Sequence, residues 1–179
     1  TTQQTEKEQI RRAIELAFQG MGMYEKAMLL DPEDLDAKRN YERAQRLRLR
    51  LEYDLGRYYF EIGEERLTQF KAKDAKTNYQ LAQQQFNHVL ENVAPNHALT
   101  KQLLPKVEER LNMLALAVEA AEHDLNIALK QIEDYQYMLA AQRLTTETNE
   151  RKYAFDLEPD LKKQYEETVQ KNQEVLKII

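Results

Sequence analysis

The stretch LPKVEERLNMLALAVEAAEHDLNIALKQIEDYQYML, residues 104–139, decides the fold. Its apolar residues recur every three or four positions for about five heptads. They are Leu104, Val107, Leu111, Leu114, Val118, Ala121, Leu125, Ala128, Ile132, Tyr135 and Leu139. This spacing predicts a helix with one apolar side. Because each buried apolar side chain contributes roughly 1.5–3 kcal/mol, we expect the 104–139 heptad stripe to pack on other helices or on a second copy, giving a homo-oligomer.

The composition of the whole chain extends the helical prediction beyond this stretch. Gly and Pro number only four each among 179 residues, and Ala, Glu, Lys, Leu and Arg make up half of them. Such a composition is typical of long helices and argues against sandwiches, barrels and doubly wound sheets, which need many turn residues. The fold class predicted is all-α, built from long antiparallel helices. Breaks at Asp31-Pro32, Ala94-Pro95-Asn96, residues 145–149 and Glu158-Pro159 predict helices over residues 6–30, 34–70, 74–93, 97–144 and 160–177.

One segment also fits a strand. RLRLRLEY, from Arg46 to Tyr53, alternates with period two. No second alternating run with turn signals follows it, so a strand there would have no partner. We therefore interpret it as helix.

Two motifs in the first half resemble the tetratricopeptide repeat (TPR). Leu55-Gly56-x-x-Tyr59, followed by Gly63, is similar to the first helix of that repeat. Ala82-x-x-x-Phe86, followed by Ala94-Pro95, is similar to the second. The resemblance implies a helical hairpin in which Gly56 packs against Ala82, while Tyr59 and Phe86 fill the adjacent space.

A second partial match lies in GMGMYEKAMLLDP, at Gly20, Tyr24, Ala27 and Asp31-Pro32. The resemblance covers roughly residues 15–95 and departs from the family at Glu52, where the signature has tryptophan. We expect TPR-like helical hairpins over 1–95 and a coiled-coil-like hairpin over 96–179, comprising a long heptad-patterned helix and a C-terminal helix. The two parts form one continuous helical domain in this prediction. A generic helical bundle explains the same spacing.

A basic stripe runs along the predicted second helix. Its members are spaced three, four or seven residues apart: Arg39, Arg43, Arg46, Arg50 and Arg57. Residues 38–57 carry seven basic and three acidic side chains, in a chain of net charge −5. The pattern predicts a local site for anionic groups. A solvated face with ion pairs along the helix explains it equally.

The TPR resemblance adds a binding surface to this stripe. It implies that Arg50, Tyr53, Arg57 and Phe60 line a concave groove for a protein or peptide partner. Arginines interleaved with aromatic residues are also typical of interface hot spots.

The sequence lacks the motifs that mark several kinds of catalytic and metal-binding site. The chain has no cysteine, and it has no glycine-rich loop, nucleophile elbow or His-Glu-x-x-His motif. We therefore predict no catalytic residues, no metal site and no cofactor. The overall negative charge disfavours nucleic acid as a partner, and no apolar run reaches the roughly 18 residues of a membrane span.

These observations favour a non-catalytic protein–protein interaction or assembly scaffold. One alternative is a binder of anionic surfaces, either lipid headgroups or nucleic acid, through the Arg39–Arg57 stripe. Another is a helical segment of a larger cell-envelope or secretion assembly. The sequence fits a soluble protein, either cytoplasmic or exported after removal of a leader.

Overall fold

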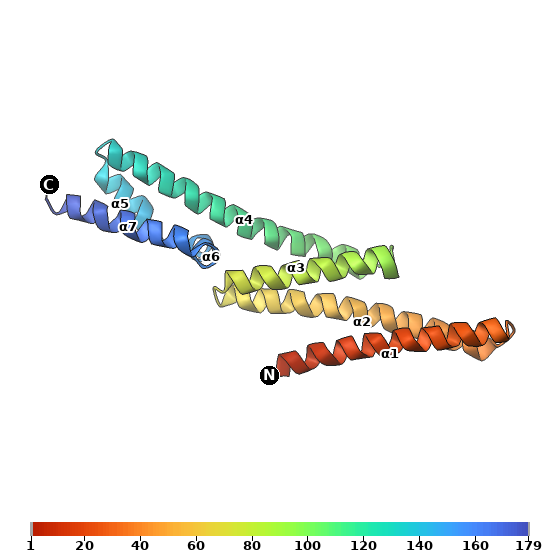
Figure 1. Cartoon of the computed structure of the whole chain (residues 1–179). Coiled ribbons are helices and arrows are strands. Elements are labelled where there is room, and N and C mark those ends of the chain that lie inside the picture. Colours follow the sequence, from red (N-terminus) through yellow and green to blue (C-terminus); the bar gives the residue numbers. More distant parts are fainter. Residues whose placement is uncertain (1, 179) are drawn as a thin grey trace. The chain divides into compact units, whose positions relative to one another are not determined.

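The computed structural model describes residues 2–178, with side chains from residue 4 onward. Their secondary structure consists of helices, without strands (Figure 1). The elements are α1 (Thr2–Leu30), α2 (Leu35–Thr68), α3 (Ala72–His88), the π-helix η1 (Val89–Val93), α4 (Ala98–Glu133), α5 (Tyr137–Thr145), α6 (Asn149–Leu157) and α7 (Pro159–Leu176). The all-α prediction is confirmed, and Arg46 to Tyr53 lies in α2 as helix rather than strand.

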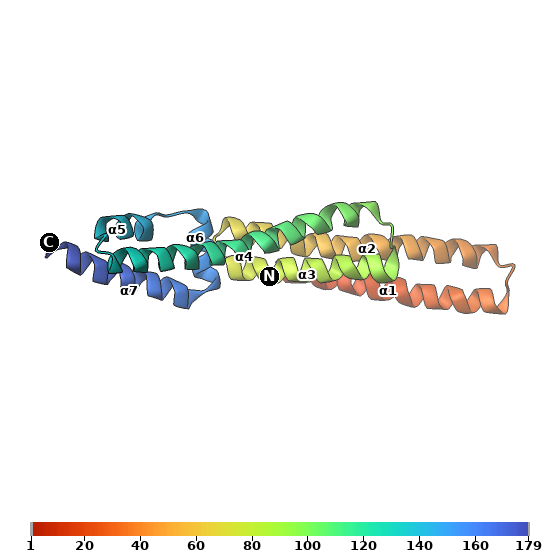
Figure 2. The same cartoon turned by 90° about the horizontal axis from the view of Figure 1, so that it is seen from above.

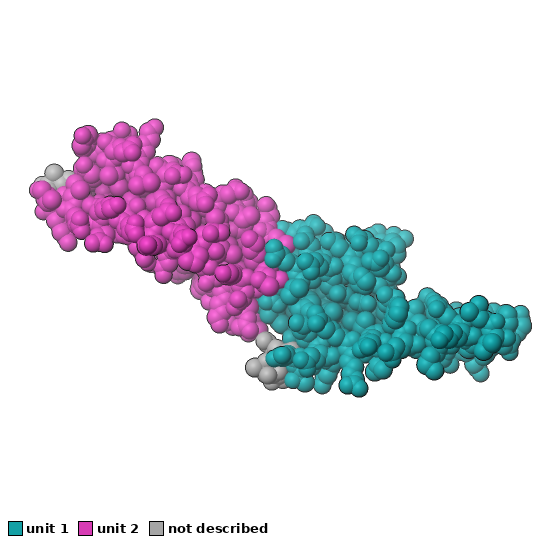
Figure 3. Space-filling model, viewed as in Figure 1, with its two compact units in different colours: residues 1–62, 78–108 teal, residues 63–77, 109–179 magenta. Residues whose placement is uncertain are grey.

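The chain forms two compact units, each assembled from separate segments (Figure 3). The first unit contains Thr1–Ile62 and Asn78–Glu108, and the second contains Gly63–Thr77 and Glu109–Ile179. The sequence predicted TPR-like hairpins up to residue 95 and a heptad-patterned part from residue 96. Both of these residues lie within the first unit.

In the first unit, α1 and α2 form an antiparallel hairpin, and α3 packs along α2 (Figure 2). The hairpin turn ends where the Asp34 carboxylate accepts a hydrogen bond from the N–H of Ala37 at 2.9 Å. This is the N-cap contact that a helix starting after Pro32 requires.

Gly56 lies directly against a side chain of α3. A β-carbon built on Gly56 would lie 2.4 Å from Cε1 of the fully buried Phe86. The sequence assigned this close approach to Ala82, which is buried as well, but the nearest atoms to Gly56 belong to the Phe86 ring. The glycine in the middle of α2 therefore makes room for an aromatic side chain of α3.

The second unit has a core built largely from small residues. Buried side chains of α4, α5, α6 and α7 meet in one cluster: Ala121, Leu125, Ala128, Ala140, Leu144, Ala154, Leu161 and Tyr165. Half of these are alanines, which allow the helix backbones to approach closely. The stripe from Leu104 to Ile132 is thus partly or fully buried within the chain itself. A second copy is not needed to cover it.

The predicted helix over 97–144 is wrong, because the chain breaks at residues 134–136. The N–H of Tyr135 bonds to the carbonyl of Ile132, and the N–H of Gln136 bonds to that of Gln131. Tyr135 has a φ of 60°, in the left-handed region where glycine is usual. The heptad pattern runs through this turn unchanged, and its last members, Tyr135 and Leu139, are exposed.

Helix α6 was not predicted either. Residues 145–149 form a break as expected, but the chain then makes a helix of nine residues before Pro159. The hydroxyl of Thr148 accepts a hydrogen bond from the N–H of Arg151 at 3.1 Å and caps this helix. The threonine is the sequence signal that could have revealed it.

Candidate interaction surface

The predicted basic stripe lies on the exposed side of α2. The side chains of Arg39, Arg46 and Arg50 are 70, 69 and 82% exposed. They lie 3.9 Å from Asp36, Glu42 and Asp54, respectively. Such exposed pairs contribute at most about 1 kcal/mol, so they hold the arginines only loosely.

The other two arginines of the stripe differ in their partners. Arg57 lies 3.5 Å from Asp54 and 3.6 Å from Glu61, which neutralise it. Arg43 has no ion-pair partner among the described side chains and is exposed. The unneutralised charge of the stripe therefore concentrates in the first half of α2.

The aromatic residues predicted to face a partner pack inside the first unit instead. The Tyr53 ring lies 5.9 Å from that of Phe86 and 5.3 Å from that of His97. The Phe60 ring lies 5.9 Å from that of Tyr79. Both side chains are half-buried, whereas Arg50 and Arg57 are exposed. Tyr53 and Phe60 thus contribute to the contact between α2 and α3.

A groove of about 440 Å³ opens where η1 ends, and the sequence did not predict it. Three elements line it: α1 with Phe18, Met21 and Glu25, α2 with Tyr41, Gln45, Arg46, Arg48 and Leu49, and η1 with Asn92 and Val93. Residues of a π-helix are often found at functional sites, since the extra residue per turn displaces side chains from the regular helical path. Arg46 is the one member of the predicted basic stripe that lines the groove.

A buried carboxylate lies beside this groove. Glu52, on α2, has a side chain only 8% exposed, and it accepts a hydrogen bond from Nε2 of Gln85 at 2.6 Å. Arg48 Nε and His88 Nε2 lie 3.6 Å from it. The guanidinium of Arg48 also stacks over the ring of Phe18 at 5.0 Å. Arg48 therefore lies between the buried carboxylate of Glu52 and the ring of Phe18, which lines the groove.

Tyr41 also lines the groove, and its hydroxyl forms a hydrogen bond with a residue of α1. It donates a hydrogen bond to Glu25 at 2.9 Å, joining α2 to α1. This hydrogen bond raises the pKa of Tyr41, and burial and the negative charge of Glu25 act in the same direction. The tyrosine is therefore a neutral donor across the physiological range.

Within the first unit, the parts of α1 and α2 nearest their connecting turn extend past the end of the α3 ribbon (Figure 2). We call this part, residues 20–47, the projection. Its exposed apolar side chains are large: Met23, Leu29, Leu30, Leu35 and Leu47, with exposed fractions of 71, 82, 89, 61 and 50%. Two helices cannot bury all of their apolar residues against one another, so the projection leaves an apolar surface in water.

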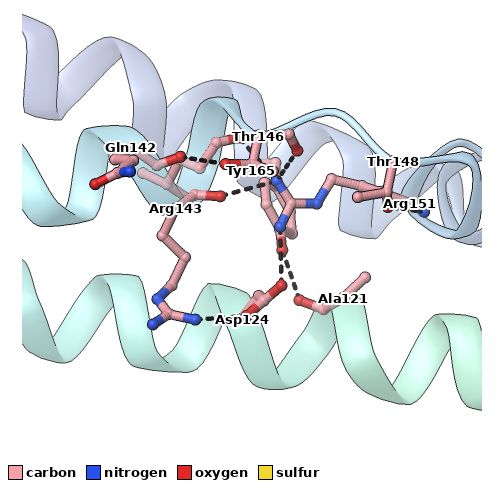
Figure 4. Close-up of polar contacts among 9 residues, drawn as sticks. Ala121, Asp124, Gln142, Arg143, Thr146, Thr148, Arg151 and Tyr165 are labelled. Carbon is pink, nitrogen blue, oxygen red and sulfur yellow. Dashed lines mark hydrogen bonds and ion pairs between the residues drawn. The ribbon is translucent and has the colours of Figure 1, made fainter.

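The second unit contains a polar cavity of about 370 Å³, but the charged side chains that line it form ion pairs with one another. Asp124 accepts hydrogen bonds from Arg143 at 2.7 Å and from Arg151 at 2.9 Å (Figure 4). Arg151, only 8% exposed, also donates to the main-chain carbonyls of Arg143, Leu144 and Thr146. These bonds connect α4, α5 and α6, so the primary role of Arg151 is to fix the turn between α5 and α6.

Tyr165, on α7, completes this network. Its ring stacks under the guanidinium of Arg151 at 4.9 Å, and its hydroxyl donates to the carbonyl of Ala121 at 2.7 Å. Burial raises the pKa of the Tyr165 hydroxyl. The cluster is thus a structural junction of four helices.

No helix in the described part of the chain has both the length and the apolarity to cross a membrane. Across the same residues, the His, Asp and Glu side chains form no group that could hold a metal ion. Comparisons with protein-family models, curated proteins and solved structures find no match. The likeness to the tetratricopeptide repeat stays a prediction.

Proposed function

We propose that this protein is a non-catalytic scaffold for protein–protein interaction, and that the projection of α1 and α2 makes the contact. The observation that carries this proposal is the apolar surface of the projection, where Leu29 and Leu30 are 82 and 89% exposed. Burying one such side chain contributes about 1.5–3 kcal/mol. A partner that covers several of them gains enough free energy to bind specifically.

These exposed residues share the two helices of the projection with the groove and the exposed arginines, and this supports an interface. Single exposed apolar residues are normal in any protein, whereas contiguous apolar surface marks interaction sites. Here the exposed residues lie on two adjacent helices, next to a groove and beside exposed arginines. An apolar centre with a charged rim is the usual anatomy of a protein interface.

The exposed arginines also support a second candidate function, the binding of anionic surfaces. Arg39, Arg46 and Arg50 are each at least 69% exposed and only loosely paired. Salt separates the two candidates, because phosphate contacts weaken by orders of magnitude as salt rises and apolar contacts do not. Retention of wild-type protein on anionic vesicles at low salt, abolished at high salt, would favour this second function.

The scaffold proposal is tested with a surface variant and a matched control. Leu29→Ser combined with Leu30→Ser removes apolar surface from the projection, and Leu116→Ser removes a 52% exposed leucine from α4. Tagged chains are compared by affinity capture from the native cell extract with quantitative mass spectrometry, after circular dichroism has shown equal helicity. We expect specific proteins to be lost with the first variant and retained with the second. Identical captured sets for all three chains would contradict the proposal.

A further inference from the structure

A second apolar stripe runs along α1, beside its buried face. We call it the outer stripe, and its members follow one another at steps of three or four residues: Ala13, Leu16, Gly20, Met23, Ala27 and Leu30. Leu16, Met23 and Leu30 are 58, 71 and 89% exposed, whereas Ala17 and Met21, on the adjacent face, are buried. We propose that the outer stripe binds the outer stripe of a second copy of this chain, with the two α1 helices antiparallel. This inference rests on the proposed function, because the stripe extends into the projection and a second copy would be the partner there.

Small and large side chains alternate along the outer stripe. The small residues are Ala13, Gly20 and Ala27, and a large residue follows each of them after three positions. Two helices pack most closely when the large side chains of one lie against the small residues of the other. An antiparallel pair centred between residues 21 and 22 meets this condition throughout. The facing residues are then Ala13 and Leu30, Leu16 and Ala27, and Gly20 and Met23.

This arrangement is complete with two copies. Gly20 of each copy receives Met23 of the other, so the same patch is used twice about a two-fold axis. A parallel pair would place Met23 against Met23 and would leave a gap between the two glycines at residue 20. The alternation of sizes therefore favours a second copy, in the antiparallel orientation, as the occupant of this face.

The first unit itself does not require glycine at residue 20. A β-carbon on Gly20 would meet only Tyr24, at 3.9 Å, which is ordinary contact. The backbone of Gly20 has no positive φ, and glycine inside a helix is less favourable than alanine. A neighbouring helix explains the residue, because the absent side chain leaves room for Met23 of a second copy.

The charges beside the outer stripe fit the same arrangement. Four exposed residues flank it without an ion-pair partner among the described side chains: Arg12, Glu15, Lys26 and Asp31. In the antiparallel pair, Lys26 lies within about 3 Å, measured along the axis, of the level of Glu15 in the other copy. Arg12 comes level with Asp31 and with the C-terminal end of the other α1, which favours a positive charge. A parallel pair would instead bring each of these charges level with its own equivalent.

Sedimentation of the full chain over a range of concentrations tests the proposal. The wild type should sediment as a dimer that dissociates on dilution. Met23→Glu places a charge in the interface and should weaken the dimer at least about tenfold, or about 1.4 kcal/mol. Leu29→Glu is the matched control, since Leu29 is 82% exposed but lies about 100° around α1 from Leu30. It should dimerise as the wild type does, and circular dichroism should show equal helicity for all three chains.

A size exchange tests the pairing of residues 20 and 23. Gly20→Met should weaken the dimer because two methionines would then meet, and Met23→Ala should weaken it by leaving a gap. The two changes in one chain restore a large residue against a small one at both places. The double variant should therefore dimerise more tightly than either single variant.

Disulfide formation tests the orientation of the two helices. The chain contains no cysteine, so cysteines can be introduced one at a time by Ala13→Cys and Leu30→Cys. Because these positions face each other in the antiparallel pair, a mixture of the two variants should form disulfide-linked dimers on mild oxidation. Neither variant alone should do so.

Three results would each overturn the proposal: a wild type that is monomeric at sub-millimolar concentrations, an unchanged dimer in Met23→Glu, or disulfides between identical positions. A double exchange that dimerises less tightly than both single variants would also overturn it. The scaffold function keeps its own test, because loss of captured proteins on changing Leu29 and Leu30 would still support it. A dimer that behaves as expected, with an unchanged set of other captured proteins, would contradict the scaffold function alone.

Discussion

The contact between Gly56 and the Phe86 ring makes a quantitative prediction. In Gly56→Ala the new methyl group would lie 2.4, 2.6 and 3.0 Å from three ring carbons of Phe86, where ordinary contact begins at 3.4 Å. The ring must move by about 1 Å, but it is fully buried. Overpacking of this kind costs about 1–3 kcal/mol, against about 1 kcal/mol gained in helix propensity.

Gly22→Ala is the matched control, because its methyl group meets nothing within 4 Å. The propensity gain is the same in both helices, so the difference between the two variants isolates the steric cost. We expect Gly56→Ala to be about 1–3 kcal/mol less stable than Gly22→Ala, and Gly22→Ala to be about 1 kcal/mol more stable than the wild type.

Urea denaturation followed by circular dichroism measures both free energies of unfolding. Phe86→Leu, which shortens the ring side chain, should be less harmful in the Gly56→Ala background than in the wild type, with a coupling of about 1 kcal/mol. If Gly56→Ala proves as stable as Gly22→Ala, then α2 and α3 do not approach at this position, and the packing of the first unit is wrong.

Three further predictions concern the second unit. Arg151→Met removes a buried guanidinium with its bonds to Asp124 and three carbonyls and should lower the free energy of unfolding by about 3 kcal/mol; a loss below 1 kcal/mol in denaturant titration would contradict it. Tyr135→Gly should raise stability by about 1 kcal/mol, since the tyrosine is 81% exposed and has a φ of 60°; an unchanged denaturation midpoint would count against strain there. The raised pKa of Tyr165 means that its neutral hydroxyl is favoured in the folded state, so stability is complete below the unfolded value of 10.0 and declines as pH rises through the higher folded value. In melting curves recorded at increasing pH, Tyr165→Phe should make the loss of stability at alkaline pH less steep. An equally steep loss in both proteins would show that Tyr165 does not cause it.

Helical spacing was sufficient to predict most of the fold. The all-α class, the long helices before residue 93 and the break after Thr145 follow from apolar periodicity and scarce turn residues. The turn at residues 134–136 could not be predicted in this way. Its left-handed residue is Tyr135 where glycine is usual, and another aromatic residue, Phe70, has the same conformation at the end of α2, with a φ of 57°.

Phe70 shows why such turns escape sequence analysis. Its ring stacks on that of Tyr153 at 5.7 Å, and Lys152 lies over it at 5.0 Å. These contacts come from α6, more than 80 residues away in sequence. They offset a backbone conformation that the local sequence would disfavour, so no local signal marks it.

The candidate site was predicted in part. The arginine spacing on α2 placed the basic stripe on one exposed side. The assignment of Tyr53 and Phe60 to the same surface came from the TPR resemblance, and in the structure both rings pack toward α3. The groove depends on where η1 ends along α1 and α2. Tertiary packing sets this position, so the local sequence does not reveal it.

Photocross-linking tests the central claim, that contacts concentrate on the projection, most directly. A photoreactive residue is placed at Leu30 on the projection, at Gln45 in the groove, or at Leu116 on α4, and adducts formed in living cells are compared. The structure predicts discrete adducts from the first two positions and few from the third, although all three side chains are exposed. Adducts of equal yield from all three, or from Leu116 alone, would show that the partner binds elsewhere.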